Sequence, residues 1–380
     1  MYKALYGSLL FLMLPLGGCQ SSAVEQTEGA KMAQQAGVEK SGFGQTADGK
    51  AVTLYTCVNR NGLVLKMIDY GATVVAVETP DRNGKKVNIT LSFPNLEGYL
   101  QPNEPYFGAT VGRYANRIGN AQFTLDGVTY KLPANDGPNS LHGGTQGFDK
   151  RIWNAVAVEN DEGVGVHFSR LSPDGEEGYP GNLQVDVVYL LTNQDELKID
   201  YRAKTDKATP VNLTNHCYWN LGGAGSGSIL NEVLMINADS YLPVDKGLIP
   251  TGKIAPVEGT PFDFLQPTPI GERIDQVPGG YDHCFVLRNQ SGELALAARV
   301  RDPESGRVME ISTTQPGIQF YTGNFLNGSA ATGGFPQHGA FCLETQHFPN
   351  SPNEPSFPST ILMPGEEYHQ VTVQHFYVEQ

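Results

Sequence analysis

Short apolar segments that alternate with polar residues run through most of the chain. Three clear examples lie near the start, at residues 52–58, 63–68 and 73–78, and Asn61-Gly62 and Gly71 separate them. Alternation with a period of two, combined with many β-branched residues, is typical of strands that bury one face. The pattern therefore predicts that the chain begins its folded part with a succession of short strands.

The same pattern continues toward the C-terminus. Residues 122–125 and 128–132 flank Asp126-Gly127, a dipeptide that favours a two-residue hairpin turn. Helical periodicity is scarce and short, and is confined to residues around 270–274. Further strands are predicted at residues 164–169, 183–191, 197–203, 232–237, 285–287, 294–300, 308–313 and 370–378.

Length and composition agree with an all-β fold. The chain has 380 residues, of which 44 are glycine and 25 are proline, so turns are frequent and a helical bundle is disfavoured. No internal repeat and no shift in composition divide the chain after residue 40. We predict one domain over residues 41–380, a large antiparallel β-sandwich with its sheets packed face to face.

The first 40 residues differ from the rest. Residues 4–16 form an apolar run after Lys3, too short to span a bilayer as a mature helix, so residues 1–18 are predicted to be a signal peptide. Gly17-Gly18 before Cys19 resembles a bacterial lipoprotein cleavage site, which implies lipidation of Cys19. The segment that follows is rich in Gln, Ser, Ala and Glu and lacks strand alternation, so residues 19–40 are predicted to carry the lipid and form a flexible tether. The expected location is the cell envelope, as a periplasmic lipoprotein anchored in the outer membrane.

Charge and cysteine usage exclude several classes of function. The net charge is -14, with 26 Lys plus Arg against 40 Asp plus Glu, so no basic surface for nucleic acid is expected. A phosphorylated substrate is disfavoured for the same reason, although local arginines can still hold one. Cys57, Cys217, Cys284 and Cys342 lack metal-ligand spacing and are expected to be free, buried thiols.

Two proton-transferring side chains stand out in polar, aromatic segments. His216 lies in Thr-Asn-His-Cys-Tyr-Trp-Asn, and Glu344 lies in Phe-Cys-Leu-Glu-Thr-Gln. A histidine and a carboxylate on opposite sides of a small molecule can give and take a proton without a metal or another cofactor. Each also has an ordinary structural interpretation. A lone glutamate on a strand, for example, usually faces solvent.

Other polar segments between the strands can supply a binding shell. Asn116 and Arg117 follow Gly-Arg-Tyr-Ala, His142 precedes two glycines, Asp263 lies between two phenylalanines, and Gln319 precedes Phe-Tyr-Thr-Gly-Asn. Aromatic rings beside hydroxyl-binding polar groups fit a sugar. Each segment alone is also compatible with a structural role as a strand end, a loop or a turn.

Taken together and in this order, the segments resemble the aldose 1-epimerase (galactose mutarotase) family. The resemblance covers about nine tenths of the chain and implies a large antiparallel β-sandwich with the sugar on its concave face. The segments that carry it are residues 112–118, 139–144, 172–181, 209–216, 241–245, 313–325 and 342–346.

The resemblance also implies roles for single residues. His216 is the expected general acid and Glu344 the expected general base in the interconversion of the α and β anomers of a free aldohexose, such as galactose or glucose. No cofactor or metal is expected, the partner is a small aldose, and the membrane contact is limited to the lipid on Cys19. The hydroxyl groups of the sugar are expected to be held by Asn116, Arg117, His142, Tyr218, Asp263 and Gln319.

Three alternatives remain open at this point. A hexose-6-phosphate epimerase of the same fold needs an additional cationic pocket, and a glycoside hydrolase needs two carboxylates that flank the scissile bond. A sugar-binding module or lectin binds without catalysis. The sequence specifies neither the preferred aldose nor the oligomeric state.

Overall fold

The computed structural model describes residues 7, 36–102 and 105–380. The predicted signal peptide, apart from Gly7, and the predicted lipidation site Cys19 lie outside these residues. Among the described residues, no helix is long and apolar enough to cross a membrane.

The first sheet is antiparallel, and its strands follow one another in sequence order. Its first strand begins at Gly37, so the folded domain starts before the predicted boundary at residue 41. The segment was not recognised from the sequence because its glycines and charged residues leave it exposed, as is common for an edge strand. The strands are β1 (Gly37–Gln45), β2 (Ala51–Val58), β3 (Val64–Ile68), β4 (Thr73–Pro80) and β5 (Lys86–Asn88).

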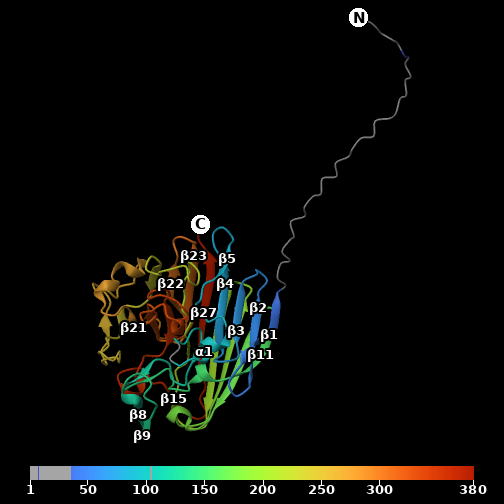
Figure 1. Cartoon of the computed structure of the whole chain (residues 1–380). Helices are drawn as coiled ribbons and strands as arrows, with labels where there is room; N and C mark the ends of the chain where they lie inside the picture. Colours follow the sequence, from blue (N-terminus) through green and yellow to red (C-terminus); the bar gives the residue numbers. More distant parts are fainter. Residues whose placement is uncertain (1–6, 8–35, 103–104) are drawn as a thin grey trace. The chain divides into compact units, whose positions relative to one another are not determined.

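The second sheet is the largest, with nine strands, and it joins the middle of the chain to its C-terminus. In Figure 1 the red strand β27 lies beside the orange strand β23, and their residues pair antiparallel. In sheet order the strands are β11 (Asn154–Glu159), β12 (Gly163–Ser172), β13 (Leu183–Thr192), β14 (Glu196–Thr205), β27 (Tyr368–Val378), β23 (Arg307–Thr313), β22 (Ala295–Arg301), β17 (Val233–Ile236) and β20 (Thr268–Pro269).

The main hydrophobic core lies where inward-facing residues of these two sheets meet, and residues from other parts of the chain complete it. Strand β13 shows how the sequence dictates it, because Leu183, Val185 and Val187 are fully buried in that core, whereas Gln184 is exposed. Burial of one such side chain stabilises the fold by about 1.5–3 kcal/mol. The predicted antiparallel β-sandwich is confirmed.

A third sheet of five strands carries much of the polar chemistry. Its order places β24 between β21 and β25, all antiparallel. Two short ladders, β16 with β6 and β7 with β10, supply the remaining polar segments. The bounds are β19 (Ala255–Pro256), β18 (Ser240–Tyr241), β21 (Asp282–Val286), β24 (Gly317–Tyr321), β25 (Cys342–Gln346), β16 (Thr214–Asn215), β6 (Thr110–Val111), β7 (Arg117–Ile118) and β10 (Ser140–Leu141).

Local predictions are also confirmed. The hairpin forms from β8 (Gln122–Leu125) and β9 (Val128–Lys131), with Asp126 and Gly127 at positive φ as a primed turn requires. The short helical pattern corresponds to two 3₁₀ turns, η4 (Ile270–Glu272) and η5 (Ile274–Gln276). The remaining elements are α1 (Leu96–Leu100), β15 (Thr209–Pro210), β26 (Ile361–Leu362) and 3₁₀ turns at residues 119–121, 148–150, 176–178, 330–332 and 351–353.

The four cysteines of the folded domain are buried and form no disulfide, as the sequence predicts. Burial raises the pKa of the Cys57 thiol to about 12, which keeps it protonated and unreactive. Cys342 differs from the others because its sulfur lies beside the ring of His216.

Candidate active site

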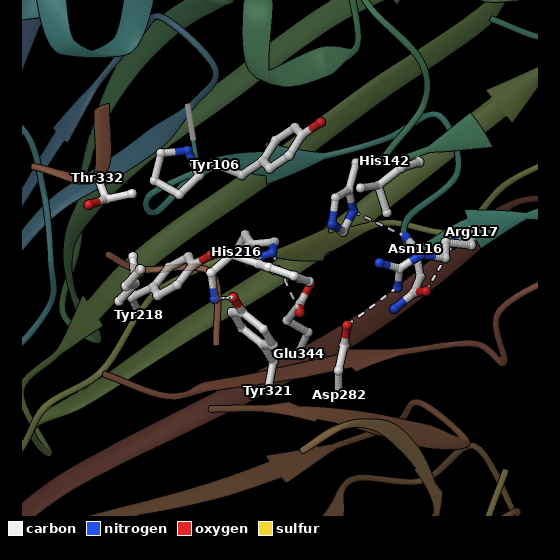
Figure 2. A pocket seen from close by; sticks show the side chains of 14 residues that line it. Tyr106, Asn116, Arg117, His142, His216, Tyr218, Asp282, Tyr321, Thr332 and Glu344 are labelled. Carbon is white, nitrogen blue, oxygen red and sulfur yellow. Dashed lines mark hydrogen bonds and ion pairs between the residues drawn. The ribbon is translucent and has the colours of Figure 1, made fainter. Parts of the chain in front are cut away.

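A cavity of about 180 Å³ opens above the third sheet. Figure 2 shows its polar side chains converging from β25, from the β7–β10 ladder and from the segment after β16. Several of the residues predicted to bind substrate meet here. The cavity is lined by Pro105, Tyr106, Asn116, Arg117, Leu141, His142, His216, Tyr218, Asp282, Tyr321, Phe325, Leu326, Thr332 and Glu344.

Glu344 is in the middle of β25, and its side chain is buried with 2% of its surface exposed. Its neighbours on the same face are Cys342 and Gln346, as strand alternation predicts, while Leu343 points into the main core. The Oε2 atom of Glu344 has no hydrogen-bond partner among the described residues. An unpaired buried carboxylate oxygen beside a cavity still has the capacity to accept a hydrogen bond.

His216 directly follows the short strand β16. Its backbone is fixed on both sides, because its N–H donates to Ala109 and its carbonyl accepts from Gly108, both at 2.9 Å. Side chains alternate through this irregular segment: His216 and Tyr218 line the cavity, whereas Cys217 lies in the main core. The imidazole is therefore presented to the cavity by a rigid, buried backbone.

The two predicted proton-transfer groups lie side by side. Nε2 of His216 is 3.7 Å from Oε1 of Glu344, and both side chains are almost completely buried. This corrects the expectation that the two groups flank the molecule from opposite sides. Two groups this close can reach two oxygens bonded to one carbon atom.

Burial opposes a charge on either member of this pair. It lowers the pKa of His216 to about 4, despite the opposing effects of a backbone hydrogen bond and of Asp282. It raises the pKa of Glu344 well above its usual value; the negative charge of Asp282 adds to this effect and Arg117 opposes it. Burial therefore favours the neutral form of each group over the charged one.

Asn116 and His142 are joined by a reciprocal pair of hydrogen bonds. The N–H of Asn116 donates to Nδ1 of His142 at 3.2 Å, and the N–H of His142 donates to the carbonyl of Asn116 at 3.1 Å. Both residues have positive φ, 63° and 52°, a conformation that the β7–β10 ladder beside them maintains. Because Nδ1 accepts a hydrogen bond, the neutral imidazole carries its proton on Nε2 and can donate it to a ligand.

Gly143, which follows His142, has a structural role. A Cβ atom there would lie 2.0 Å from the carbonyl oxygen of Gly112, and φ is +86°. A glycine is therefore required at this position because the protein's own backbone approaches it closely.

The two arginines of the segment 112–118 have different roles. Arg113 is buried away from the cavity, and its guanidinium donates to the backbone carbonyls of Pro180 and Gly181. Arg117 lines the cavity and is held by Asp136 at 2.8 Å and Asp282 at 3.5 Å. The structural interpretation holds for Arg113, whereas Arg117 lies at the cavity, where its binding role stays a prediction.

The structure does not bring Asp263 into the cavity. Its carboxylate accepts a hydrogen bond from the N–H of Leu265, so it stabilises its own turn. The aspartate at the cavity is Asp282, the first residue of β21, which sequence reasoning missed. A signal was present, because Asp282 alternates with Cys284 and Val286 at the start of an apolar strand, two residues after Gly280.

Gln319 lies behind this aspartate. It pairs with Glu344 across β24 and β25, and its Nε2 donates to Oδ1 of Asp282 at 2.6 Å. Gln319 itself does not line the cavity. It orients Asp282, whereas the sequence predicted that Gln319 would contact the substrate directly. Tyr106, Tyr321 and Phe325 also line the cavity without having been assigned a role from the sequence.

Substitution of Asp282 by asparagine is expected to lower kcat/KM about 10- to 100-fold, because the charged partner of Arg117 and an acceptor at the cavity are lost together. Asp263→Asn is the matched control and should change kcat/KM less than about twofold, since Asp263 stabilises a turn outside the cavity. Steady-state rates of catalysis by both variants check this. A larger loss in Asp263→Asn than in Asp282→Asn would contradict this assignment.

The sandwich and its buried histidine–glutamate pair define an acid–base enzyme that acts on a small hydroxylated molecule. Residues 53–375 match the family described as aldose 1-epimerase. The chain is 50% identical over 339 residues to galactose mutarotase of Sus scrofa, covering 88% of this chain and 97% of the relative. It is 40% identical over 341 residues to aldose 1-epimerase of Escherichia coli K12, covering 87% and 97%.

Solved structures agree with the sequence comparison. Galactose 1-epimerase of Lactobacillus acidophilus superposes with a TM-score of 0.80 at 29% identity, covering 90% of this chain and 99% of that one. An aldose epimerase homologue of C. elegans superposes with a TM-score of 0.79 at 30% identity, covering 87% and 100%. The chain belongs to the aldose 1-epimerase family. It is an isomerase that interconverts the anomers of aldoses.

Proposed function

We propose that His216 is the general acid and Glu344 the general base of this anomer interconversion. The observation that carries the proposal is their geometry: Nε2 and Oε1 are 3.7 Å apart, and the second oxygen of Glu344 has no partner among the described residues. In an aldopyranose the anomeric hydroxyl and the ring oxygen are bonded to the same carbon, C1. An acid and a base that lie side by side can therefore act on both at once.

The proposed step is balanced in protons. Glu344 removes the proton of the anomeric hydroxyl, the bond between C1 and the ring oxygen breaks, and His216 protonates the ring oxygen. The product is the free aldehyde. Rotation about the C1–C2 bond presents the other face of the aldehyde, and the reverse transfers close the ring as the other anomer.

The protonation state of the pair fits this cycle. Ring opening begins with anionic Glu344 and cationic His216 and ends with both groups neutral. Burial destabilises the charged starting pair relative to the neutral one, as the shifts in both pKa values indicate. The buried site therefore favours the step that opens the ring, and the single proton of the pair is conserved over the whole cycle.

The remaining polar groups are proposed to hold the hydroxyl groups of the sugar. Neutral His142 donates from Nε2, because the N–H of Asn116 occupies Nδ1. Arg117 donates from its guanidinium, and Asp282 accepts. Asn116 and Tyr218 add polar contacts at the cavity wall, while Gln319 keeps Asp282 in place.

The preferred substrate is proposed to be a free aldohexose such as galactose, in keeping with the names of the relatives. Among the described residues that line the cavity, Arg117 is the cation, and two carboxylates already bind it. This supports an unphosphorylated sugar. Polarimetry over a panel of anomerically pure free and 6-phosphorylated aldoses tests the proposal, and preference for a phosphorylated sugar would refute it.

We also propose that the enzyme is a lipoprotein of the cell envelope, anchored through Cys19. The support is the sequence Leu-Gly-Gly-Cys after an apolar run, followed by a tether without strand alternation. Wild-type protein expressed in a bacterium is expected to incorporate labelled palmitate, and Cys19→Ala is expected to incorporate none. A Cys19→Ala protein that still carries lipid would contradict the proposed anchor.

A further inference from the structure

Strand β25 contacts both nitrogens of the His216 ring. Glu344 lies 3.7 Å from Nε2, and Sγ of Cys342, two residues earlier on the same face, lies 3.7 Å from Nδ1. The second distance is within the range of a hydrogen bond to sulfur, which is longer than one to oxygen. Cys342 is fully buried and does not line the cavity, so it approaches the ring from the protein side.

The faces of the same ring are covered by aromatic side chains. Tyr218 is stacked on it with ring centres 5.1 Å apart, and Tyr106 lies over it at 5.8 Å, both nearly parallel. His142 approaches at 5.0 Å and almost at right angles. Figure 2 shows the imidazole enclosed in this group. Because the ring cannot turn freely, the groups at its two nitrogens determine where its protons lie.

We propose that Cys342 is a positioning residue for His216. Its thiol hydrogen-bonds to Nδ1 and so holds Nε2 toward Glu344 and the sugar. The inference rests on the proposed role of His216 as the general acid. It adds a residue that acts through the histidine and never touches the substrate.

A thiol suits a histidine that changes its charge during each turnover. Burial raises the pKa of Cys342 well above its usual value, so the group remains S–H. When His216 is cationic, Nδ1–H donates to the sulfur. When Nε2 has given its proton to the ring oxygen, the neutral ring keeps its proton on Nδ1, which still donates to the sulfur. A thiol sulfur is a weak acceptor, so it holds Nδ1–H in both states without strongly favouring either.

Three variants test the proposal. Cys342→Ala removes the partner and is expected to lower kcat about tenfold, the equivalent of one hydrogen bond, with KM changed less than about threefold. Cys342→Ser keeps a group that donates and accepts, and should recover most of the lost kcat. Cys57→Ala, another buried thiol in the main core, is the matched control and should retain wild-type kcat.

Nitrogen-15 NMR of the His216 ring measures which ring nitrogen carries the proton, a property that a change in packing alone would not alter. The distribution of the proton between Nδ1 and Nε2 should shift in Cys342→Ala and return in Cys342→Ser. Wild-type kcat in Cys342→Ala, or an unchanged ring spectrum in that variant, would overturn the proposal. Failure of the acid role would appear separately, as wild-type activity in His216→Asn.

Discussion

Replacement of Glu344 by glutamine lowers kcat for aldose anomerisation about 10²- to 10⁴-fold, the usual contribution of a positioned general base. Glutamine has the same shape and can still accept a hydrogen bond, but it cannot take the proton of the anomeric hydroxyl. The rate is measured by polarimetry with an anomerically pure aldose, after subtraction of spontaneous mutarotation.

The stability of the same variant separates chemistry from folding. Glu344 is buried with an unpaired oxygen, so its replacement by a neutral amide should not lower the melting temperature. Glu310→Gln is the matched control, because Glu310 is also on a strand but contacts Arg299 and Tyr377 away from the cavity. It should retain wild-type kcat. Wild-type turnover in Glu344→Gln would remove the base from the mechanism.

Replacement of His216 by asparagine is expected to lower kcat by a similar factor, about 10²- to 10⁴-fold. Asparagine can still donate a hydrogen bond into the cavity, so substrate binding is affected less than turnover. It cannot transfer a proton to the ring oxygen, and the opening step loses its acid. Polarimetry at several concentrations of aldose separates kcat from KM.

His167→Asn is the matched control for this histidine. His167 is on β12 and pairs with Asp186 at 2.8 Å, with more than a third of its side chain exposed. Its replacement should leave kcat and KM unchanged. If His216→Asn raised KM and left kcat at the wild-type value, His216 would be a binding residue and the acid would have to be sought elsewhere in the cavity.

The fold could be predicted from the sequence wherever one face of a strand is buried. Residues 183–191 alternate clearly, and the observed strand β13 matches them within one residue. Strand β1 was missed because an exposed edge strand has no apolar face to reveal it. The β16 segment that carries His216 is a two-residue strand, and its position depends on pairing with distant backbone.

The site could be predicted less completely, because its residues come together only through long-range register. His216 and Glu344 were recognised through their segments and the family resemblance, but their 3.7 Å separation depends on where β25 lies relative to β16. Asp263 was selected for its flanking phenylalanines, a local signal that a turn also produces. The position of Asp282 at the cavity could be predicted only by knowing that β21 pairs with β24, which places Asp282 beside Gln319.

The double variant His216→Asn/Glu344→Gln tests the central claim most directly. Groups that act together in one chemical step show strongly non-additive effects, because removal of either already abolishes the concerted transfer. The account predicts that kcat of the double variant, measured by polarimetry, lies within about threefold of the slower single variant. A loss equal to the product of the two single losses would show independent contributions and would contradict a shared proton-transfer step.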